Sequence, residues 1–116
     1  TIIRKVKSMP PMNKEEVSVT RNIRMIEWLK CELIAGVSSL FDLCFKGAKA
    51  SQEALLDVLA NIIMVAYLLG KRLGLSFYDI DGSLEDKLKM GILEDHEAEK
   101  WFSDLSDLRQ YIKNNR

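Results

Sequence analysis

The sequence has few of the residues that break helices, bind zinc or form disulfides. Its two prolines are adjacent, at Pro10 and Pro11, so the chain beyond them lacks the strongest helix-breaking residue. A single histidine, His96, and the absence of a CxxC motif argue against a structural zinc site. Cys31 and Cys44 are too far apart along one helix to form a disulfide, so we expect reduced, buried thiols.

The sequence also lacks an excess of basic or acidic residues and a long uninterrupted apolar segment. The chain has 17 basic and 17 acidic residues, and this balance gives no overall attraction to duplex nucleic acid or to an anionic membrane. The longest uninterrupted apolar run, residues 62–70, is well short of the roughly 20 residues of a membrane-spanning helix. The first residues do not form a secretory signal. We therefore expect a cytoplasmic protein with no nucleic-acid duplex and no membrane as partner.

The length and apolar content fit one helical domain. The chain has 116 residues, of which 47% are hydrophobic, enough to close one core. The proline pair marks the edge of the folded part, so we expect an N-terminal arm at residues 1–14 and a single domain at residues 15–116.

Apolar residues recur at helical spacing along most of this domain, and no segment alternates as a strand does. We expect one long helix, or two nearly collinear ones, over residues 20–46, and a second helix from Gln52 to about Leu73 after a GAKAS turn. A Ser76–Asp79 capping box predicts a third helix, which Gly91 ends. The apolar spacing in residues 94–115 predicts a fourth helix, broken near Ser103 or Ser106.

Short loops between these helices favour antiparallel packing, so the fold class is all-α, a bundle of about four helices. Helices this apolar would leave exposed faces in one four-helix chain, and small residues that permit close helix contact occur at Ala35, Gly36, Ser38 and Ser39. We therefore expect a homodimer or a homotetramer.

The second helix carries a line of polar residues. Residues 54–69 are apolar except for Asp57 and Asn61, and Glu53, Asp57 and Asn61 follow one another at four-residue intervals along one side. A carboxylate on so apolar a helix is costly unless it is paired, hydrogen-bonded or bound to a metal. On the preceding helix Glu32 also enters an apolar stretch, but it lies about fifteen residues before the turn, whereas Asp57 lies about six after it. The first helix would have to bend or shift for the two to meet.

These residues resemble a known family. The segments CELIAG, QEALLDVLANIIMVAYLLGKRLGLSFYDI and KLKMG, over roughly residues 23–91, are similar to the MazG-like all-α nucleoside triphosphate pyrophosphohydrolases, and in particular to their short single-domain branch. The resemblance implies that an EExxE motif on one helix and an ExxD motif on the next hold Mg²⁺. The metal binds a nucleoside triphosphate and activates water, giving a monophosphate and pyrophosphate.

The resemblance assigns the Mg²⁺ ligands residue by residue. Glu32 matches the second glutamate of EExxE, and Asp57 matches the aspartate of ExxD. Glu53, on nearly the same face as the glutamate expected in ExxD, is its candidate substitute. The remaining motif positions are occupied by Cys31, Ala35 and Ala54. The resemblance therefore implies Mg²⁺ held by Glu32, Glu53 and Asp57, and it identifies no catalytic residue beyond the metal.

Four further residues are candidates for nucleotide binding. Lys87 and Lys89 resemble the basic residues that the family places near the triphosphate, and Trp28, one turn before Glu32, offers an aromatic face for a base. Asn61 extends the polar line. Each has an ordinary alternative, because the two lysines point to different faces and suit solvent, and Trp28, Phe41, Tyr67 and Trp101 suit a core or an interface.

Two functions follow from this pattern. One is a Mg²⁺-dependent nucleoside triphosphate pyrophosphohydrolase with a depleted acidic motif. The other is a non-catalytic helical module that binds a nucleotide or a protein through the same cleft. A third interpretation treats Asp57 and Asn61 as a polar seam that fixes helix register in an oligomer. The seam and the metal site both predict that Asp57 is largely buried and within reach of Glu53 or Glu32.

Overall fold

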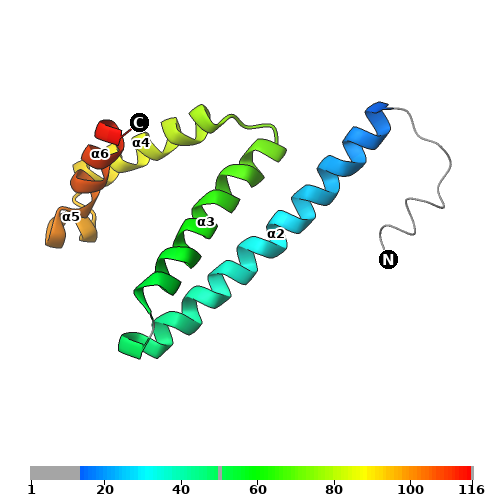
Figure 1. Cartoon of the computed structure of the whole chain (residues 1–116). Helices are drawn as coiled ribbons and strands as arrows, with labels where there is room; N and C mark the ends of the chain where they lie inside the picture. The colour runs from blue at the N-terminus through cyan, green and yellow to red at the C-terminus, as the bar shows by residue number, and fades with distance from the viewer. Residues whose placement is uncertain (1–13, 50, 116) are drawn as a thin grey trace. The chain divides into compact units, whose positions relative to one another are not determined.

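The computed structural model describes residues 14–49 and 51–115, and these residues are almost entirely helical (Figure 1). The predicted arm lies outside the described residues except for Lys14, which begins the first described helix. The elements are α2 (Lys14–Lys46), a short 3₁₀ helix η1 (Gly47–Lys49), α3 (Gln52–Arg72), α4 (Phe77–Leu93), α5 (Glu97–Phe102) and α6 (Asp104–Asn115). The all-α prediction is confirmed.

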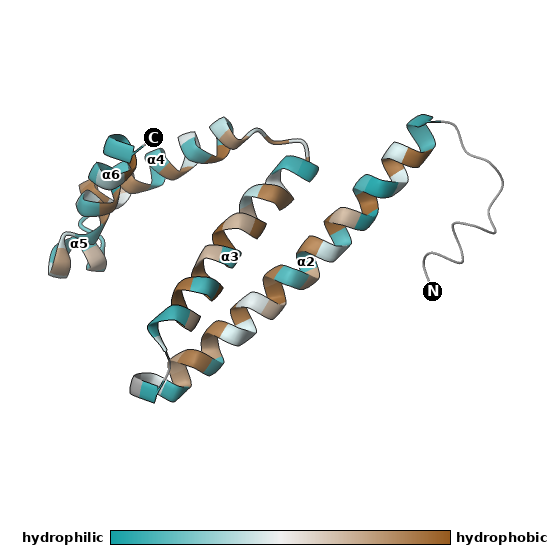
Figure 2. Cartoon of the chain, in the orientation of Figure 1, coloured by the Kyte–Doolittle hydropathy of each residue, from teal (hydrophilic) through white to brown (hydrophobic). Residues whose placement is uncertain are grey.

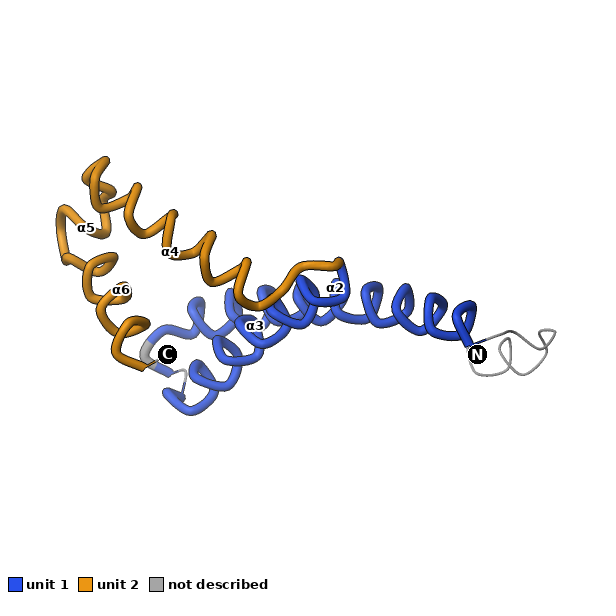
Figure 3. Tube along the Cα trace, turned by 90° about the horizontal axis from the view of Figure 1, so that it is seen from above, with its two compact units in different colours: residues 1–73 blue, residues 74–116 orange. Residues whose placement is uncertain are grey.

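The chain divides into two compact units, residues 1–73 and residues 74–116 (Figure 3). Within its described residues the first unit contains α2 and α3, and the second contains α4, α5 and α6. The single domain expected over residues 15–116 stays a prediction.

In the first unit α2 and α3 form an antiparallel hairpin, whose two helices lie side by side (Figure 1). The turn between them lies at the predicted GAKAS segment. Gly47 adopts φ +58°, the left-handed conformation that suits glycine after a helix, and the Ser51 hydroxyl accepts a hydrogen bond from the Ala54 N–H at 3.0 Å. The turn of the α2–α3 hairpin is therefore determined by local sequence features, Gly47 at the end of α2 and the N-cap Ser51 before α3.

The two helices of the hairpin meet along a narrow line. Leu29 of α2 and Val65 of α3 are almost fully buried. Gly36 lets the helices approach, because a Cβ at this position would lie 3.1 Å from Cγ1 of Ile62. At the open end Asn22 donates to the backbone oxygen of Arg72 at 3.1 Å and accepts from its guanidinium at 3.2 Å. These contacts fix which residues of α2 stand opposite which residues of α3.

In the second unit α6 packs against α4, and α5 connects them. Leu88 is the buried centre of α4. Glu85 of α4 accepts a hydrogen bond from Nε of Arg109 at 2.7 Å, which links the two helices by a half-buried ion pair. Glu99 of α5 accepts hydrogen bonds from the backbone N–H and the hydroxyl of Ser106 in α6, so α5 is tied to α6 as well.

Two helix ends differ from the prediction. Gly91 does not end the third helix, because α4 continues to Leu93 and its end is formed by Asp95 at φ +58°, with the His96 N–H bonded to the Gly91 carbonyl at 2.8 Å. The last helix begins later than residue 94, at Glu97, where the His96 ring accepts a hydrogen bond from the Ala98 N–H. The predicted break is confirmed at Ser103, which adopts φ +57°.

Several side chains that were expected inside lie at the surface of the chain. Both cysteines are free, as predicted, but exposed rather than buried. The aromatic residues Trp28, Phe41 and Trp101 are exposed as well, while Tyr67 is half-buried. For the residues of α2 the physical reason is that each helix of the hairpin has one partner helix within its unit, so most of its circumference remains uncovered.

Candidate functional site

The α2–α3 hairpin has two unlike sides. In an α-helix residues nine apart point in opposite directions, at about 100° per residue. Glu32 is nine residues from Ile23 and nine from Phe41, and Leu59 is nine residues from Leu68. None of these five residues is among the buried residues that mark the line of contact, which are Leu29 and Gly36 on α2 and Val65 and Gly70 on α3. On each helix the contact line therefore separates two different surfaces.

The sides of the two helices correspond because the helices are antiparallel. Each helix is viewed along its own axis from N- to C-terminus. In an antiparallel pair, residues displaced in the same rotational sense from the two contact lines then lie on the same side of the pair. By this construction Glu32 on α2 lies on the same side as Asp57 and Asn61 on α3, and we name this the acidic side. The opposite side, the apolar side, carries Ile23, Ile34 and Phe41 from α2 and Leu59 and Ile63 from α3, all exposed.

Glu32 and Asp57 share the acidic side but not the same level along it. Gly36 and Ile62 stand opposite each other, which sets the register of the hairpin. Counting from this pair, Glu32 lies at the level of residue 66, and counting from the Asn22–Arg72 contact it lies at the level of residue 62. Glu32 is therefore roughly 8–13 Å along the axis from Asp57 in an ideal helix. The mismatch in level that the sequence predicted is therefore present.

Asp57 is exposed, so the prediction that it is largely buried is wrong for a single chain. The reason is its place on α3: Val58, Ile62, Val65 and Leu69 form the contact line, and Asp57 projects about 100° from Val58. No hydrogen bond or ion pair within the described residues holds the Asp57 carboxylate. A hydrogen-bonded seam between α2 and α3 is therefore not formed, because α2 covers only the contact line.

The other predicted ligands are placed as follows. Glu32 and Asn61 are half-buried at the edge of the contact line, and Glu53 is exposed in the first turn of α3. Residues 14–49 and 51–115 contain no group of three or more histidine, cysteine, aspartate or glutamate side chains that could hold a metal. The structure thus brings Glu32, Asp57 and Asn61 to one side of the hairpin without gathering Glu32, Glu53 and Asp57 into one cluster.

Trp28 lies on the acidic side, one turn from Glu32. Its indole is 56% exposed, so a flat aromatic face is open beside a carboxylate. This is the arrangement that base stacking needs. Its role in nucleotide binding stays a prediction.

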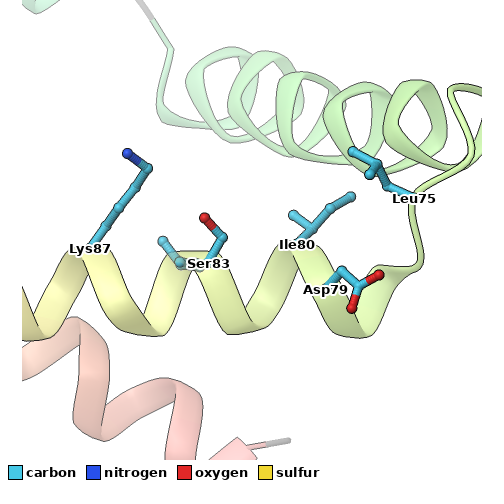
Figure 4. Close-up of a pocket in the computed structure, with 6 residues that line it drawn as sticks. Leu75, Asp79, Ile80, Ser83 and Lys87 are labelled. Atoms are coloured by element: carbon cyan, nitrogen blue, oxygen red, sulfur yellow. The ribbon is translucent and has the colours of Figure 1, made fainter.

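Lys87 lines a shallow hollow on α4. Figure 4 shows Ile80, Ser83 and Lys87 projecting from one side of the helix, and Asp79 and Leu75 lie at its start. Asp79, Ser83 and Lys87 follow one another at four-residue intervals and so form a polar line. Sequence reasoning singled out Lys87 but missed Asp79 and Ser83 as its neighbours, although their spacing is visible in the sequence.

Lys89 belongs to a different face of α4, as predicted. It acts on Glu85, one turn before it, together with Arg109 and Lys113 of α6. The hydrogen bond from Arg109 holds the pKa of the Glu85 carboxyl below its ordinary value, and the charges of Arg109, Lys89 and Lys113 lower it further against the opposing effect of burial. The two lysines therefore serve two separate surfaces.

The apolar surface of the hairpin continues around α3. Figure 2 shows apolar residues along most of this helix between polar ends. In the described part of the chain α3 is the one helix long and apolar enough to cross a membrane by length and composition, with a mean hydropathy of 1.8 over 18 residues. Core helices of soluble proteins pass the same test, so this gives weak support for a span. It nevertheless shows that counting uninterrupted apolar runs underestimated the apolar character of α3.

The fold and this site define an all-α protein with an antiparallel hairpin whose acidic side carries separated carboxylates. A sequence model of the MazG-like family matches residues 19–105, which include most of α2 and all of α3, α4 and α5. The chain belongs to the MazG-like family. Comparisons with curated proteins and with solved structures gave no significant match.

Proposed function

We propose that this protein binds a nucleoside triphosphate with Mg²⁺ on the acidic side of the α2–α3 hairpin and is a candidate pyrophosphohydrolase. The observation that supports this proposal is that the two motif carboxylates, Glu32 and Asp57, lie on the same side of the hairpin in a chain of the MazG-like family. The reaction is inferred from the family resemblance, and the location of the site is inferred from the geometry of the hairpin.

The residues on the acidic side fit a single, largely hydrated Mg²⁺ rather than a closed metal cage. Asp57 and Asn61, one turn apart, offer a carboxylate and an amide oxygen, which are hard ligands of the kind Mg²⁺ takes. Glu32 lies more than one helical turn from Asp57 along the hairpin, so we do not assign it to this ion. Mg²⁺ commonly binds one or two carboxylates and completes its shell with water and substrate phosphates, where it neutralises phosphate charge.

The separation of Glu32 and Asp57 suits the two ends of one extended ligand. Asp57 and Asn61 would hold the metal and the phosphates near the closed end of the hairpin, while Trp28 and Glu32 would face the nucleoside nearer its open end. Trp28 supplies a stacking surface, and a carboxylate beside it can accept hydrogen bonds from sugar hydroxyls. The protein would then position the triphosphate by its two ends.

A second function has its own supporting observation. The described residues contain no cluster of three metal-binding side chains, and a lone carboxylate with an amide gives weak affinity for Mg²⁺ without substrate. A MazG-like chain with such a site can bind a nucleotide without hydrolysing it. A nucleotide-sensing or protein-interaction module is therefore the alternative to the pyrophosphohydrolase.

One experiment separates these functions. We expect Mg²⁺ alone to leave the melting temperature nearly unchanged, and Mg²⁺ with a mixture of nucleoside triphosphates to raise it, because metal and phosphates complete one site together. Asp57→Asn should abolish the rise, whereas Asp86→Asn, which removes the same charge from an exposed position on α4, should keep it. Pyrophosphate release is measured in the same samples. Release that is lost in Asp57→Asn supports the hydrolase, and binding without release supports the sensing module. No binding with any triphosphate rejects both of these and leaves the protein-interaction module.

We also propose that a second copy of the chain covers the apolar side of the hairpin. Ile34 and Phe41 are each 71% exposed, and Leu59 and Ile63 continue the surface onto α3. Exposed apolar surface of this extent marks an interface. A membrane-spanning α3 is disfavoured because Asp57 lies within its apolar stretch and a charge at that depth of a bilayer is costly. In this arrangement the acidic side stays open to ligand.

A further inference from the structure

A second polar hollow lies in the unit formed by residues 74–116, between α4 and α6. It is lined by Ile92 from α4 and by Ser106, Arg109, Gln110 and Lys113 from α6, and its volume is about 190 Å³. The four α6 residues follow one another at intervals of three, one and three, so they form one stripe of the helix. Most of α6 lies beyond the residues matched by the MazG-like family, which end at residue 105.

Positive charge is concentrated at this hollow in a unit that is otherwise acidic. Residues 74–116 contain ten acidic and six basic residues. Arg109 and Lys113 line the hollow, and Lys89 lies close enough to act on the same carboxylate, Glu85. Half of the basic residues of the unit therefore converge on one surface between two helices.

Two carboxylates near the hollow, Glu85 and Glu99, already have partners. Glu85 accepts a hydrogen bond from Nε of Arg109 at 2.7 Å, and Glu99 accepts two from Ser106. The donors left for a ligand are the terminal nitrogens of Arg109, the Lys113 ammonium and the Gln110 side-chain amide. The Gln110 amide nitrogen makes one long hydrogen bond, at 3.3 Å to Oδ1 of Asn114. Two cations, Arg109 and Lys113, line the hollow, and its lining includes no carboxylate.

The ion pair with Glu85 also fixes the guanidinium. Both side chains are about 30% exposed, at 30% for Arg109 and 27% for Glu85, so the pair is held between the helices rather than free in solvent. A guanidinium anchored through Nε presents its two outer nitrogens as a planar fork, the geometry that binds two oxygens of a phosphate or carboxylate. Arg109 is thus oriented before a ligand arrives.

We propose that the hollow between α4 and α6 is a binding site for a phosphate group, with Arg109, Gln110 and Lys113 as its donors. The size is consistent with this class of ligand, since about 190 Å³ is below the roughly 300–1,000 Å³ of sites for drug-sized molecules. A free phosphate ion and the phosphate end of a nucleotide share this chemistry. The site is formed by other residues than those of the acidic side, and it does not depend on the function proposed there.

The test is a titration of the isotope-labelled full chain with inorganic phosphate, followed by NMR. Chloride is exchanged for phosphate at constant ionic strength, so that general screening does not change. We expect saturable shifts confined to the Gln110 side-chain amide and Arg109 Nε–H. A parallel titration with a nucleoside monophosphate identifies the source: equal affinity assigns the free ion, and tighter binding assigns a nucleotide.

Two variants make the test specific. Replacing Arg109 would leave Glu85 without its partner, so Lys113→Gln is the informative change, and we expect it to weaken phosphate binding about tenfold, as loss of one charge-assisted hydrogen bond does. Lys100→Gln removes the same charge from an exposed position on α5 outside the hollow and should keep the wild-type affinity. Shifts that rise linearly without saturation, or an equal loss of affinity in both variants, would overturn the proposal.

Discussion

A Cβ at position 91 of α4 would lie 2.5 Å from Cδ1 of Leu105 in α6. The absence of a side chain at Gly91 therefore lets α6 rest directly on α4. The same glycine was expected to end a helix, and it instead lies inside one. Its role is close packing between two helices, which a single sequence cannot distinguish from a helix stop.

This contact gives a prediction about stability with a control in the same helix. Gly91→Ala gains about 1 kcal/mol of helix propensity but overpacks the contact with Leu105 at a cost of about 1–3 kcal/mol. We expect the free energy of unfolding to fall by about 1 kcal/mol. Gly82→Ala, where a Cβ meets nothing within 4 Å, should instead raise it by about 1 kcal/mol. Urea unfolding measures both, and a stabilised Gly91→Ala variant would contradict the close contact.

The helices were predictable because their signals are local. Ser51 and Ser76 accept hydrogen bonds from the N–H groups three residues on, at 3.0 and 2.9 Å, as capping sequences predict. The end of α4 was not predictable in this way, since it depends on Asp95 in the left-handed conformation and on the contact of α6 with Gly91. Contacts between helices override local preference, and one sequence does not contain them explicitly.

The ion pair between Glu85 and Arg109 predicts how stability depends on pH. Arg109 lowers the pKa of Glu85 in the folded chain from an ordinary value of 4.5. A carboxyl whose folded pKa is lowered stabilises the fold fully above its unfolded pKa, and this stabilisation is lost as the pH falls through the folded pKa. Wild type should therefore be more stable than Glu85→Gln near neutral pH, and the difference should shrink as the pH falls below about 4.5.

Thermal unfolding of the two proteins between neutral pH and pH 3 measures this difference. Asp86→Asn removes a negative charge from the adjacent, exposed position and controls for net charge. A difference between wild type and Glu85→Gln that stays constant over the whole range would show that the ion pair does not contribute through its charge.

The candidate site was predicted in part. The spacing of Asp57 and Asn61 placed them on one side of α3, and the resemblance added Glu32. Their shared side follows from helix geometry once the hairpin is known. The exposure of Asp57 did not follow from the sequence, because an apolar helix looks buried whether its cover comes from the same chain or from another one. The stripe of Arg109, Gln110 and Lys113 was missed, since its meaning depends on Glu85 in another helix.

The apolar and acidic sides of the α2–α3 hairpin should respond differently to a charged substitution if the chain dimerises through the apolar side. Leu59 and Leu68 are the same residue type on one helix, with exposures of 44% and 40%, and they point to opposite sides because they are nine residues apart. If a second copy covers the apolar side, Leu59→Asp places an unpaired carboxylate in the interface and should weaken the dimer on the order of a hundredfold, whereas Leu68→Asp on the acidic side should not. Sedimentation across a concentration series measures the dissociation, and circular dichroism checks that both variants stay helical. Equal dissociation of the two variants would contradict a one-sided interface. A monomeric wild type that partitions onto lipid vesicles would assign the apolar side to a membrane instead.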